Sequence, residues 1–310
     1  MAPILMVTNA DAGSTDRDSI DTALAILRAR CEVEVVVSKD PRELDQILRD
    51  AGVRTIVVAG GDGSLHAVID SLYANEDLTG RTLALLPLGT GNDFARALDL
   101  PLEPEAAARV IVSGTSRRVD LIVEESGDVV VNSVHAGAGT KASMTGAKWK
   151  SRLAPFGLGI LGYPIGAALT AMNPPTVRLA VEVDGEVVAR PDRRLLMVVV
   201  GNGSSVGGGA ELTPDADPGD GYIDVMISSS AGPIARLAYA WGIRGGNHPA
   251  RTDVITRRAK RVSISGERFW ISADGEIDGP HDRRTWHVLP SAYKIIVPGA
   301  SATPHASNGT

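Results

Sequence analysis

The sequence is poor in cysteine, in aromatic residues and in positive charge, and each shortage excludes a class of protein. The only cysteine in the 310 residues is Cys31, which excludes an internal disulfide and a cysteine-based zinc site. Aromatic residues make up 4% of the chain, too few for a protein that stacks successive bases of a single-stranded nucleic acid. The formal net charge is −6, which is also unlike a nucleic-acid-binding protein. We therefore expect no nucleic-acid partner.

The sequence also lacks an uninterrupted hydrophobic run that would form a regular membrane-spanning helix. The stretch from Leu153 to Met172 carries no charge, but Pro155 and Pro164 would break a helix within it. Basic residues precede this run, a pattern that fits either a packed segment or a segment touching an anionic membrane surface. The N-terminus has no basic segment ahead of an apolar one, so we predict no signal peptide.

Hydrophobic residues, at 44% of the chain, are abundant enough for a large core, and their spacing divides the chain into two parts. Apolar runs at 3–8, 32–37, 54–59 and 82–86 alternate with segments of helical spacing, which predicts an α/β domain with a parallel sheet. After about residue 122 most segments have the character of strands, at 129–134, 177–183, 187–189, 195–200, 222–227, 261–265, 269–273 and 294–297. Helical character is expected within 233–243 and in part of 141–172, and Asp184-Gly185 is typical of a hairpin turn. This second part is predicted to be a β-rich sandwich.

We accordingly predict three regions. An α/β domain occupies residues 1–122, a β-rich domain occupies residues 123–299, and a small, polar, disordered tail occupies residues 300–310.

Two glycine-rich loops follow neighbouring strands of the first domain. Gly60-Gly61-Asp62-Gly63 lies between a strand and a helix, and Gly89 to Phe94 follows the next strand. Successive backbone N–H groups at a helix N-terminus form a cradle for phosphate, and open α/β sheets bind ligands at the carboxyl ends of their strands. A tight turn is the alternative for either loop alone. The segment from Asn9 to Gly13 is a third loop at the same end of the sheet.

Asp274-Gly275-Glu276 follows an apolar strand in the second part. The segment is either a plain hairpin turn or a pair of carboxylates that takes a proton from an alcohol and helps to neutralise phosphoryl charge through Mg²⁺. The histidines show no spacing typical of metal ligands.

Four motifs together resemble the diacylglycerol kinase catalytic-domain family, which includes bacterial lipid kinases and the sphingosine and ceramide kinases. They are VVAGGDGSLHAV at 57–68, PLGTGNDFAR at 87–96, PDADPGDGYIDV at 214–225 and ADGEIDG at 273–279. The resemblance covers residues 2–298 and implies an N-terminal α/β ATP-binding domain, a β-rich C-terminal domain and an active site between them.

The resemblance also implies roles for individual residues. It implies ATP contacts from Asn9, Ala10, Asp11, Ala12, Gly13, Ser38, Gly60, Gly61, Asp62, Gly63, Ser64, Leu65, His66, Thr90, Asn92 and Asp93, with Asp62 at the phosphates. Ala10 stands where the family usually has proline, and the family's nucleotide-contacting threonine after the second strand has only Ser38 as a nearby counterpart.

The catalytic and metal-binding roles that the resemblance implies lie in the second domain, apart from Asp62. Glu276 is expected to accept the proton of the lipid hydroxyl, with Asp274 beside it. A structural Mg²⁺ is expected at Asp217, Asp220 and Tyr222.

The implied function is Mg²⁺-dependent transfer of the γ-phosphoryl group of ATP to diacylglycerol, which yields phosphatidic acid. We expect a cytoplasmic protein that contacts the inner face of the membrane peripherally, through residues 141–172 and the basic residues Arg257, Arg258, Lys260 and Arg261.

Three alternatives stay open. The acceptor could be another lipid alcohol such as a sphingoid base or ceramide. NAD kinases share the Gly-Gly-Asp-Gly loop, although we do not expect them to carry the two longer motifs at 87–96 and 214–225. A non-catalytic lipid-binding relative is the third alternative, and a homodimer is left open.

Overall fold

The computed structural model describes residues 2–9, 17–138, 140, 176–229 and 252–299. These residues form two compact units. The first contains residues up to Val119 together with those from Ala292 onward, and the second runs from Asp120 to Ser291.

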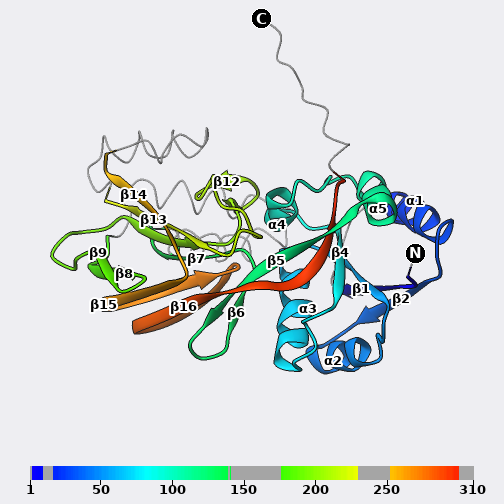
Figure 1. Cartoon of the computed structure of the whole chain (residues 1–310), viewed down its shortest axis with the longest axis horizontal. Helices are drawn as coiled ribbons and strands as arrows, with labels where there is room; N and C mark the ends of the chain where they lie inside the picture. The colour runs from blue at the N-terminus through cyan, green and yellow to red at the C-terminus, as the bar shows by residue number, and fades with distance from the viewer. Residues whose placement is uncertain (1, 10–16, 139, 141–175, 230–251, 300–310) are drawn as a thin grey trace, which may run out of the picture. The chain divides into compact units, whose positions relative to one another are not determined.

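The first unit is an α/β layer structure. Its elements are β1 (Ile4–Asn9), α1 (Arg17–Arg28), β2 (Val33–Ser38), α2 (Pro41–Arg49), β3 (Thr55–Gly60), α3 (Asp62–Ala74), β4 (Thr82–Pro87), α4 (Asp93–Ala97) and α5 (Pro104–Ser113). The strands pair in the order β2-β1-β3-β4, all parallel, and the end of β16 (Glu276–Val297) adds beside β4 through Lys294 and Ile295. Helices α1 and α5 lie on one side of this sheet, and α2 and α3 lie on the other (Figure 1).

The alternation of strand side chains explains these two layers. Ile4 and Met6 of β1 point to the same face and share a core with Leu27 of α1 and Ile111 of α5. Because both faces of the sheet are covered, all six residues of β3 are buried, as expected for a parallel strand. The predicted parallel α/β domain is confirmed.

The second unit is antiparallel and β-rich. β5 (Thr115–Glu124) begins in the first unit and enters the second. The strands that follow are β6 (Val129–Val130), β7 (Ser133–Gly137), β8 (Leu179–Val183), β9 (Glu186–Ala189), β10 (Met197–Gly201), β11 (Ser205–Val206), β12 (Ala210–Glu211), β13 (Ile223–Ser228), β14 (Val254–Ala259) and β15 (Arg261–Ala273). The order β14-β13-β10-β7-β15-β16 is antiparallel throughout, and β8 pairs with β15 and β9. Phe269 and Trp286 are buried within its core.

The predicted strands of this unit largely match the observed ones, with several differences. The expected strand at 129–134 is divided into β6 and β7, whereas Arg261–Ala273 is one strand rather than two. The short strands β11 and β12 and the strand β14 were not predicted, and β16 is much longer than the predicted strand at 294–297. The hairpin at Asp184-Gly185 is confirmed, because both residues have positive φ and connect β8 to β9. The expected helices within 233–243 and 141–172 lie outside the described residues.

The division into compact units differs from the linear division expected from the sequence. Residues from Ala292 to Val297 contact the first unit, although they follow the second unit in the chain. The domain boundaries at 122 and 299 stay predictions.

The two glycine loops of the first unit pack against each other without intervening side chains. A Cβ atom added to Gly89 would lie 2.5 Å from Cα of Gly61 and 2.8 Å from Oδ1 of Asn92. Neither of these two atoms belongs to the end of a flexible side chain that could move aside. The close approach of the two loops therefore requires glycine at position 89. A Cβ atom added to Gly63, within α3, would meet no atom of the described residues within 4 Å.

We predict that Gly89→Ala destabilises the first unit, whereas Gly63→Ala does not. The clash at position 89 should lower the free energy of unfolding by about 1–3 kcal/mol. Alanine at position 63 should raise it by up to about 1 kcal/mol, because alanine is the better helix former. Urea unfolding of both variants measures the difference, and equal stabilities would contradict the packing described here.

Burial of His135 on β7 provides a second prediction. Desolvation lowers the pKa of His135 to about 4, against the opposing effect of the Asp274 charge. In the unfolded chain the imidazole pKa is about 6.5, so protonation favours unfolding below that pH. The stabilisation is complete above pH 6.5 and is lost as the pH falls towards 4.

Between pH 7 and pH 5 the protein should lose about 2 kcal/mol of unfolding free energy through this residue. His135→Gln should flatten the pH dependence, whereas His287→Gln, at an exposed position of β16, should leave it unchanged. Unfolding curves across this pH range test the assignment, and identical slopes for the two variants would refute it.

Candidate active site

The first glycine loop lies where β3 ends and α3 begins. Gly61 is the N-cap residue of α3, and no side chain within the described part of the chain caps this helix end. The first turn therefore presents backbone N–H groups and the positive end of the helix dipole, an arrangement that suits an anionic phosphate group.

Asp62 links this loop to the second one. Its carboxylate accepts the backbone N–H of Asp93 at 3.1 Å through Oδ2 and that of Phe94 at 3.0 Å through Oδ1. These donors are at the start of α4, so Asp62 acts as a cap for a helix about 30 residues further along the chain. The structure thus gives Asp62 an organising role, in addition to the phosphate role predicted from sequence.

Asn92 shapes the second loop. Its backbone is left-handed with φ of 51°, and its side-chain amide bonds both the N–H of Gly89 at 3.0 Å and the carbonyl of Gly89 at 2.8 Å. This closure leaves Thr90 exposed at the loop tip. Thr90 is therefore accessible to a ligand, and its contact with ATP stays a prediction.

The remaining predicted nucleotide residues have varied environments. Ser64 and His66 are half-buried in the first turns of α3, whereas Leu65 is fully buried and offers only its backbone. The hydroxyl of Ser38 donates to the carbonyl of Asp40 at 3.1 Å. Asn9 ends β1, and residues 10–13 lie outside the described residues.

Asp274 forms the turn of the β15–β16 hairpin in the second unit. Its carboxylate accepts three consecutive backbone N–H groups, from Val131 at 2.7 Å, Asn132 at 2.9 Å and Ser133 at 3.0 Å. Its own N–H donates to the carbonyl of Ser133 at 2.9 Å. Asp274 and Gly275 both have positive φ, so the turn is a tight two-residue one. The carboxylate of Asp274 is thus a structural clamp between the hairpin and the start of β7.

Glu276 is the first residue of β16 and pairs with Ala273 across the turn. Its side chain is exposed, and within the described part of the chain it accepts no hydrogen bond. The two carboxylates of this turn therefore differ: that of Asp274 is held by three backbone N–H groups, whereas that of Glu276 is exposed.

The predicted metal residues lie in a turn-rich loop before β13. Oδ1 of Asp217 accepts the N–H of Gly219 at 2.9 Å, and Oδ1 of Asp220 accepts the N–H of Tyr222 at 3.0 Å. Asp220 also forms an ion pair with Arg258 of β14, whose guanidinium lies 4.5 Å from the centre of the Tyr222 ring.

Asp120 of β5 anchors this loop from the other side. It accepts the N–H of Gly221 at 2.6 Å and that of Ser291 at 2.7 Å, and its own N–H donates to the carbonyl of Pro218 at 2.6 Å. Sequence reasoning missed Asp120. A single acidic residue inside the apolar run VDLIV was the available signal, because a buried aspartate needs hydrogen-bond donors.

The loop and the strand that follows it form an acidic environment. Burial raises the pKa of Asp224 to about 6, and the negative charges of Asp220 and Asp215 add to the rise, against the effect of Arg258. No three His, Cys, Asp or Glu side chains cluster as a metal site among the residues that the structure describes. The loop instead offers carboxylate and backbone oxygens in a negative potential, which fits a hard cation such as Mg²⁺.

Comparisons with known proteins agree with this architecture. The family model of the diacylglycerol kinase catalytic domain matches residues 3–123, and that of the YegS C-terminal NAD kinase beta sandwich-like domain matches residues 129–297. A protein of Stenotrophomonas maltophilia named "Probable lipid kinase YegS-like" is 31% identical over 302 residues, covering 92% of this chain and 93% of that protein. A diacylglycerol kinase of Staphylococcus carnosus is 33% identical over 227 residues, covering 72% and 70% of the two chains.

The fold is also similar to a solved structure. A crystal structure of a diacylglycerol kinase from Bacillus anthracis superposes with a TM-score of 0.76 at 23% identity, covering 97% of this chain and 98% of that one. This likeness confirms the predicted fold class, a parallel-sheet α/β domain followed by a β-rich one. The family models and the relatives together show that the chain belongs to the diacylglycerol kinase family of lipid kinases.

Proposed function

We propose that this protein is an ATP- and Mg²⁺-dependent lipid kinase that phosphorylates a membrane lipid alcohol, with diacylglycerol as the favoured acceptor. The single observation that carries the proposal is the state of the two carboxylates at the β15–β16 turn. Asp274 accepts three backbone N–H groups, and the neighbouring Glu276 is exposed and accepts none from the described residues. Names of relatives, diacylglycerol kinase and lipid kinase, support the acceptor class.

In this proposal the hydroxyl oxygen of the lipid attacks the γ-phosphorus of ATP, and Glu276 accepts the proton of that hydroxyl. The bond between the γ-phosphorus and the bridging oxygen breaks, and ADP leaves with the electron pair. Backbone N–H groups at the start of α3 stabilise the phosphate oxygens, and the exposed Thr90 at the tip of the second loop is placed to contact the nucleotide. Asp62 contributes by holding the two loops together.

Asp217, Asp220 and the backbone of Tyr222 are the residues that would hold a Mg²⁺ ion. Bound there, the ion would supply positive charge that fixes the acidic loop. Arg258 supplies part of that charge through its ion pair with Asp220.

The proposed acceptor requires contact with a membrane. Among the residues that the structure describes, no helix is both long and apolar enough to cross a bilayer. Basic side chains at 257, 258, 260 and 261 are exposed, which supports peripheral contact with an anionic leaflet at the cytoplasmic face. The other expected contact, residues 141–172, lies outside the described residues.

The direct test is transfer of labelled γ-phosphate from ATP into lipids in mixed micelles. The panel contains diacylglycerol, sphingosine and ceramide, with NAD as a soluble acceptor. We expect labelled phosphatidic acid. Labelling of NAD alone would overturn the lipid assignment, and labelling of a sphingoid base or ceramide alone would overturn the diacylglycerol assignment.

Glu276→Gln should lower turnover about 10²- to 10⁴-fold, the usual contribution of a general base, with little change in ATP binding. Glu186→Gln, at an exposed position of β9, is the matched control and should retain full turnover. Near-normal turnover of Glu276→Gln would show that another group accepts the proton.

Removing Arg258 should tighten Mg²⁺ binding, because the guanidinium competes for the Asp220 carboxylate. The pair is half-exposed, so the gain in affinity for Mn²⁺, as a paramagnetic substitute, should be only about 2- to 10-fold in Arg258→Gln. Arg257→Gln is the control, since Arg257 donates to the carbonyl of Thr256 and forms no ion pair with a residue that the structure describes. Absence of Mn²⁺ binding, or equal affinities in the two variants, would contradict the assignment.

A further inference from the structure

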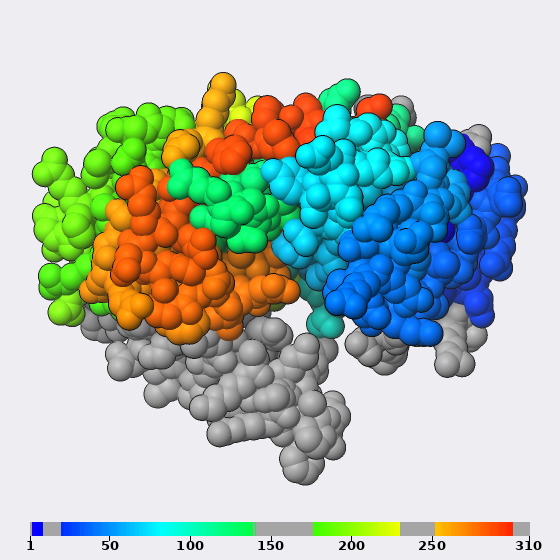
Figure 2. All heavy atoms as spheres, turned by 90° about the horizontal axis from the view of Figure 1, so that it is seen from below, coloured from blue at the N-terminus to red at the C-terminus, as the bar shows by residue number. Residues whose placement is uncertain are grey.

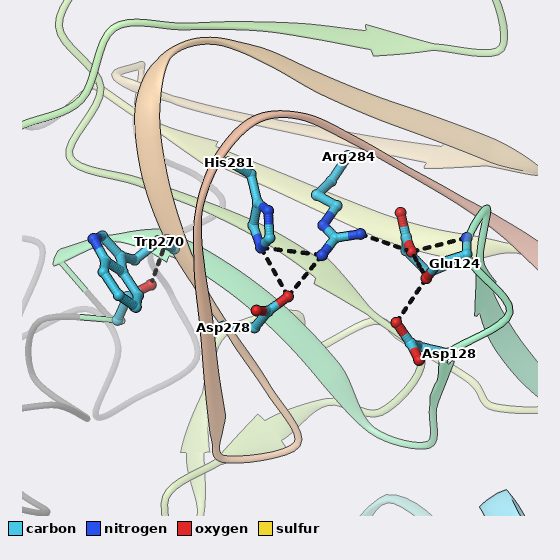
Figure 3. A network of polar contacts seen from close by, with 8 residues as sticks. Glu124, Asp128, Trp270, Asp278, His281 and Arg284 are labelled. Carbon is cyan, nitrogen blue, oxygen red and sulfur yellow. Dashed lines mark hydrogen bonds and ion pairs between the residues drawn. The ribbon is translucent and has the colours of Figure 1, made fainter.

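A polar network in the second unit connects β16 to β5 (Figure 3). Arg284 of β16 donates from Nη2 to Oδ2 of Asp278 at 2.7 Å and from Nη1 to Oε2 of Glu124 at 3.1 Å. Nε2 of His281 lies 2.8 Å from the same Oδ2 of Asp278. One guanidinium therefore bridges two carboxylates that belong to different strands.

The network is shielded from water at its β5 end. The side chain of Glu124 is 7% exposed and that of Arg284 is 19% exposed. The hydroxyl of Ser126 also donates to Glu124. Ion pairs at this depth resist screening by salt, and removing one partner leaves a charge that water reaches poorly. Removing one partner of this contact is consequently more costly than removing one partner of a surface ion pair.

The charge state of Asp278 agrees with this arrangement. Desolvation alone would raise its pKa, but hydrogen bonds and charges from His281 and Arg284 outweigh desolvation and lower the pKa of Asp278. The carboxylate is therefore anionic at neutral pH. The ring of His281 packs edge-on against Phe269, with 6.3 Å between the ring centres, which fixes the imidazole from its other side.

The network lies where the β15–β16 ladder is irregular. Phe269 is opposite His281 and Ile271 is opposite Asp278, so β16 has one residue more than β15 between these pairs. Pro280 within this bulge has no N–H to donate to the ladder. The contacts of Asp278 with His281 and Arg284 span the bulge and hold the strand where backbone pairing is interrupted.

Asp278 and Glu276 are two residues apart on one strand, and residues at this spacing project from the same face. Contacts that hold Asp278 in place therefore also restrict the orientation of Glu276 on the same strand. In Figure 2 the side chains of this hairpin, in orange, form a continuous surface of the second unit.

We propose that Arg284 is a positioning residue that, by bridging Asp278 and Glu124 across the β-bulge, fixes the strand segment that carries Glu276. The proposal rests on the proposed function, because the network is proposed to orient Glu276, the residue that accepts the proton in that function. Arg284 acts through Asp278 and does not touch the reacting groups.

The test compares Arg284→Gln with Arg283→Gln in the full chain. Arg283 is the adjacent, exposed residue of the same strand, so both variants lose the same charge. We expect kcat for lipid phosphorylation to fall about ten-fold or more in Arg284→Gln with KM for ATP unchanged, because small misplacements of a reacting group are costly. Arg283→Gln should behave as the parent protein.

A second variant separates positioning from global stability. Asp278→Asn removes the other half of the bridge, and the double variant Arg284→Gln/Asp278→Asn should be no slower than the worse single variant if both act through one contact. Asp282→Asn is its control, since Asp282 is exposed and its contact with Arg268 is long, at 3.9 Å. Additive losses in the double variant would overturn the proposal, as would a kcat for Arg284→Gln within about two-fold of that for Arg283→Gln.

Hydrogen exchange distinguishes this proposal from the proposed function itself. Peptides covering residues 276–281 should exchange faster in Arg284→Gln and in Asp278→Asn than in the two controls, whatever reaction the protein catalyses. Unchanged exchange overturns the network's positioning role. If exchange accelerates but Glu276→Gln retains full turnover, the assignment of Glu276 as the proton acceptor has failed instead.

Discussion

Three backbone N–H groups that converge on one carboxylate determine the geometry of the candidate site. Val131, Asn132 and Ser133 donate to Asp274, although they are more than 140 residues away in the chain. The contact holds the left-handed turn in place and sets the start of β16, whose first residue is Glu276. The proposed role of Glu276 depends on this contact. An exposed carboxylate accepts a proton efficiently only if the strand that carries it is held in a fixed orientation.

The same use of carboxylates recurs elsewhere in the molecule. Asp62 holds the start of α4, and Asp120 holds the acidic loop and Ser291. In each case an acidic side chain satisfies backbone N–H groups that no strand or helix could pair. Of these two aspartates, Asp62 belongs to a motif of the family and Asp120 to none, yet both have structural contacts of the same kind.

The sequence was informative where the signal is local. The strand periodicity of 54–59 and the glycines at 60, 61 and 63 predicted the β3–α3 junction, and Asp184-Gly185 predicted the hairpin between β8 and β9. β14 was missed because Thr256, Arg257 and Arg258 are exposed and polar, which hides the strand pattern. The route of β16 back to β4 could not be predicted, because strand pairing over such distances leaves no mark on local spacing. The bridge made by Arg284 could not be predicted for a related reason. The bulge at Gly279 and Pro280 shifts the register of β16, so the residues that contact one another on this strand do not follow the two-residue period.

The measurement that tests the account most directly is amide hydrogen exchange of Val131, Asn132 and Ser133, resolved by NMR, in Asp274→Asn and in Asp282→Asn. Val131 donates to Oδ2, whereas Asn132 and Ser133 both donate to Oδ1. An asparagine has one acceptor oxygen, so at least one of these two sets of amides should lose protection in Asp274→Asn, and all three amides should keep it in Asp282→Asn. Retention of parental protection at all three amides in Asp274→Asn would show that the carboxylate does not hold the turn, and the proposed positioning of Glu276 would lose its foundation.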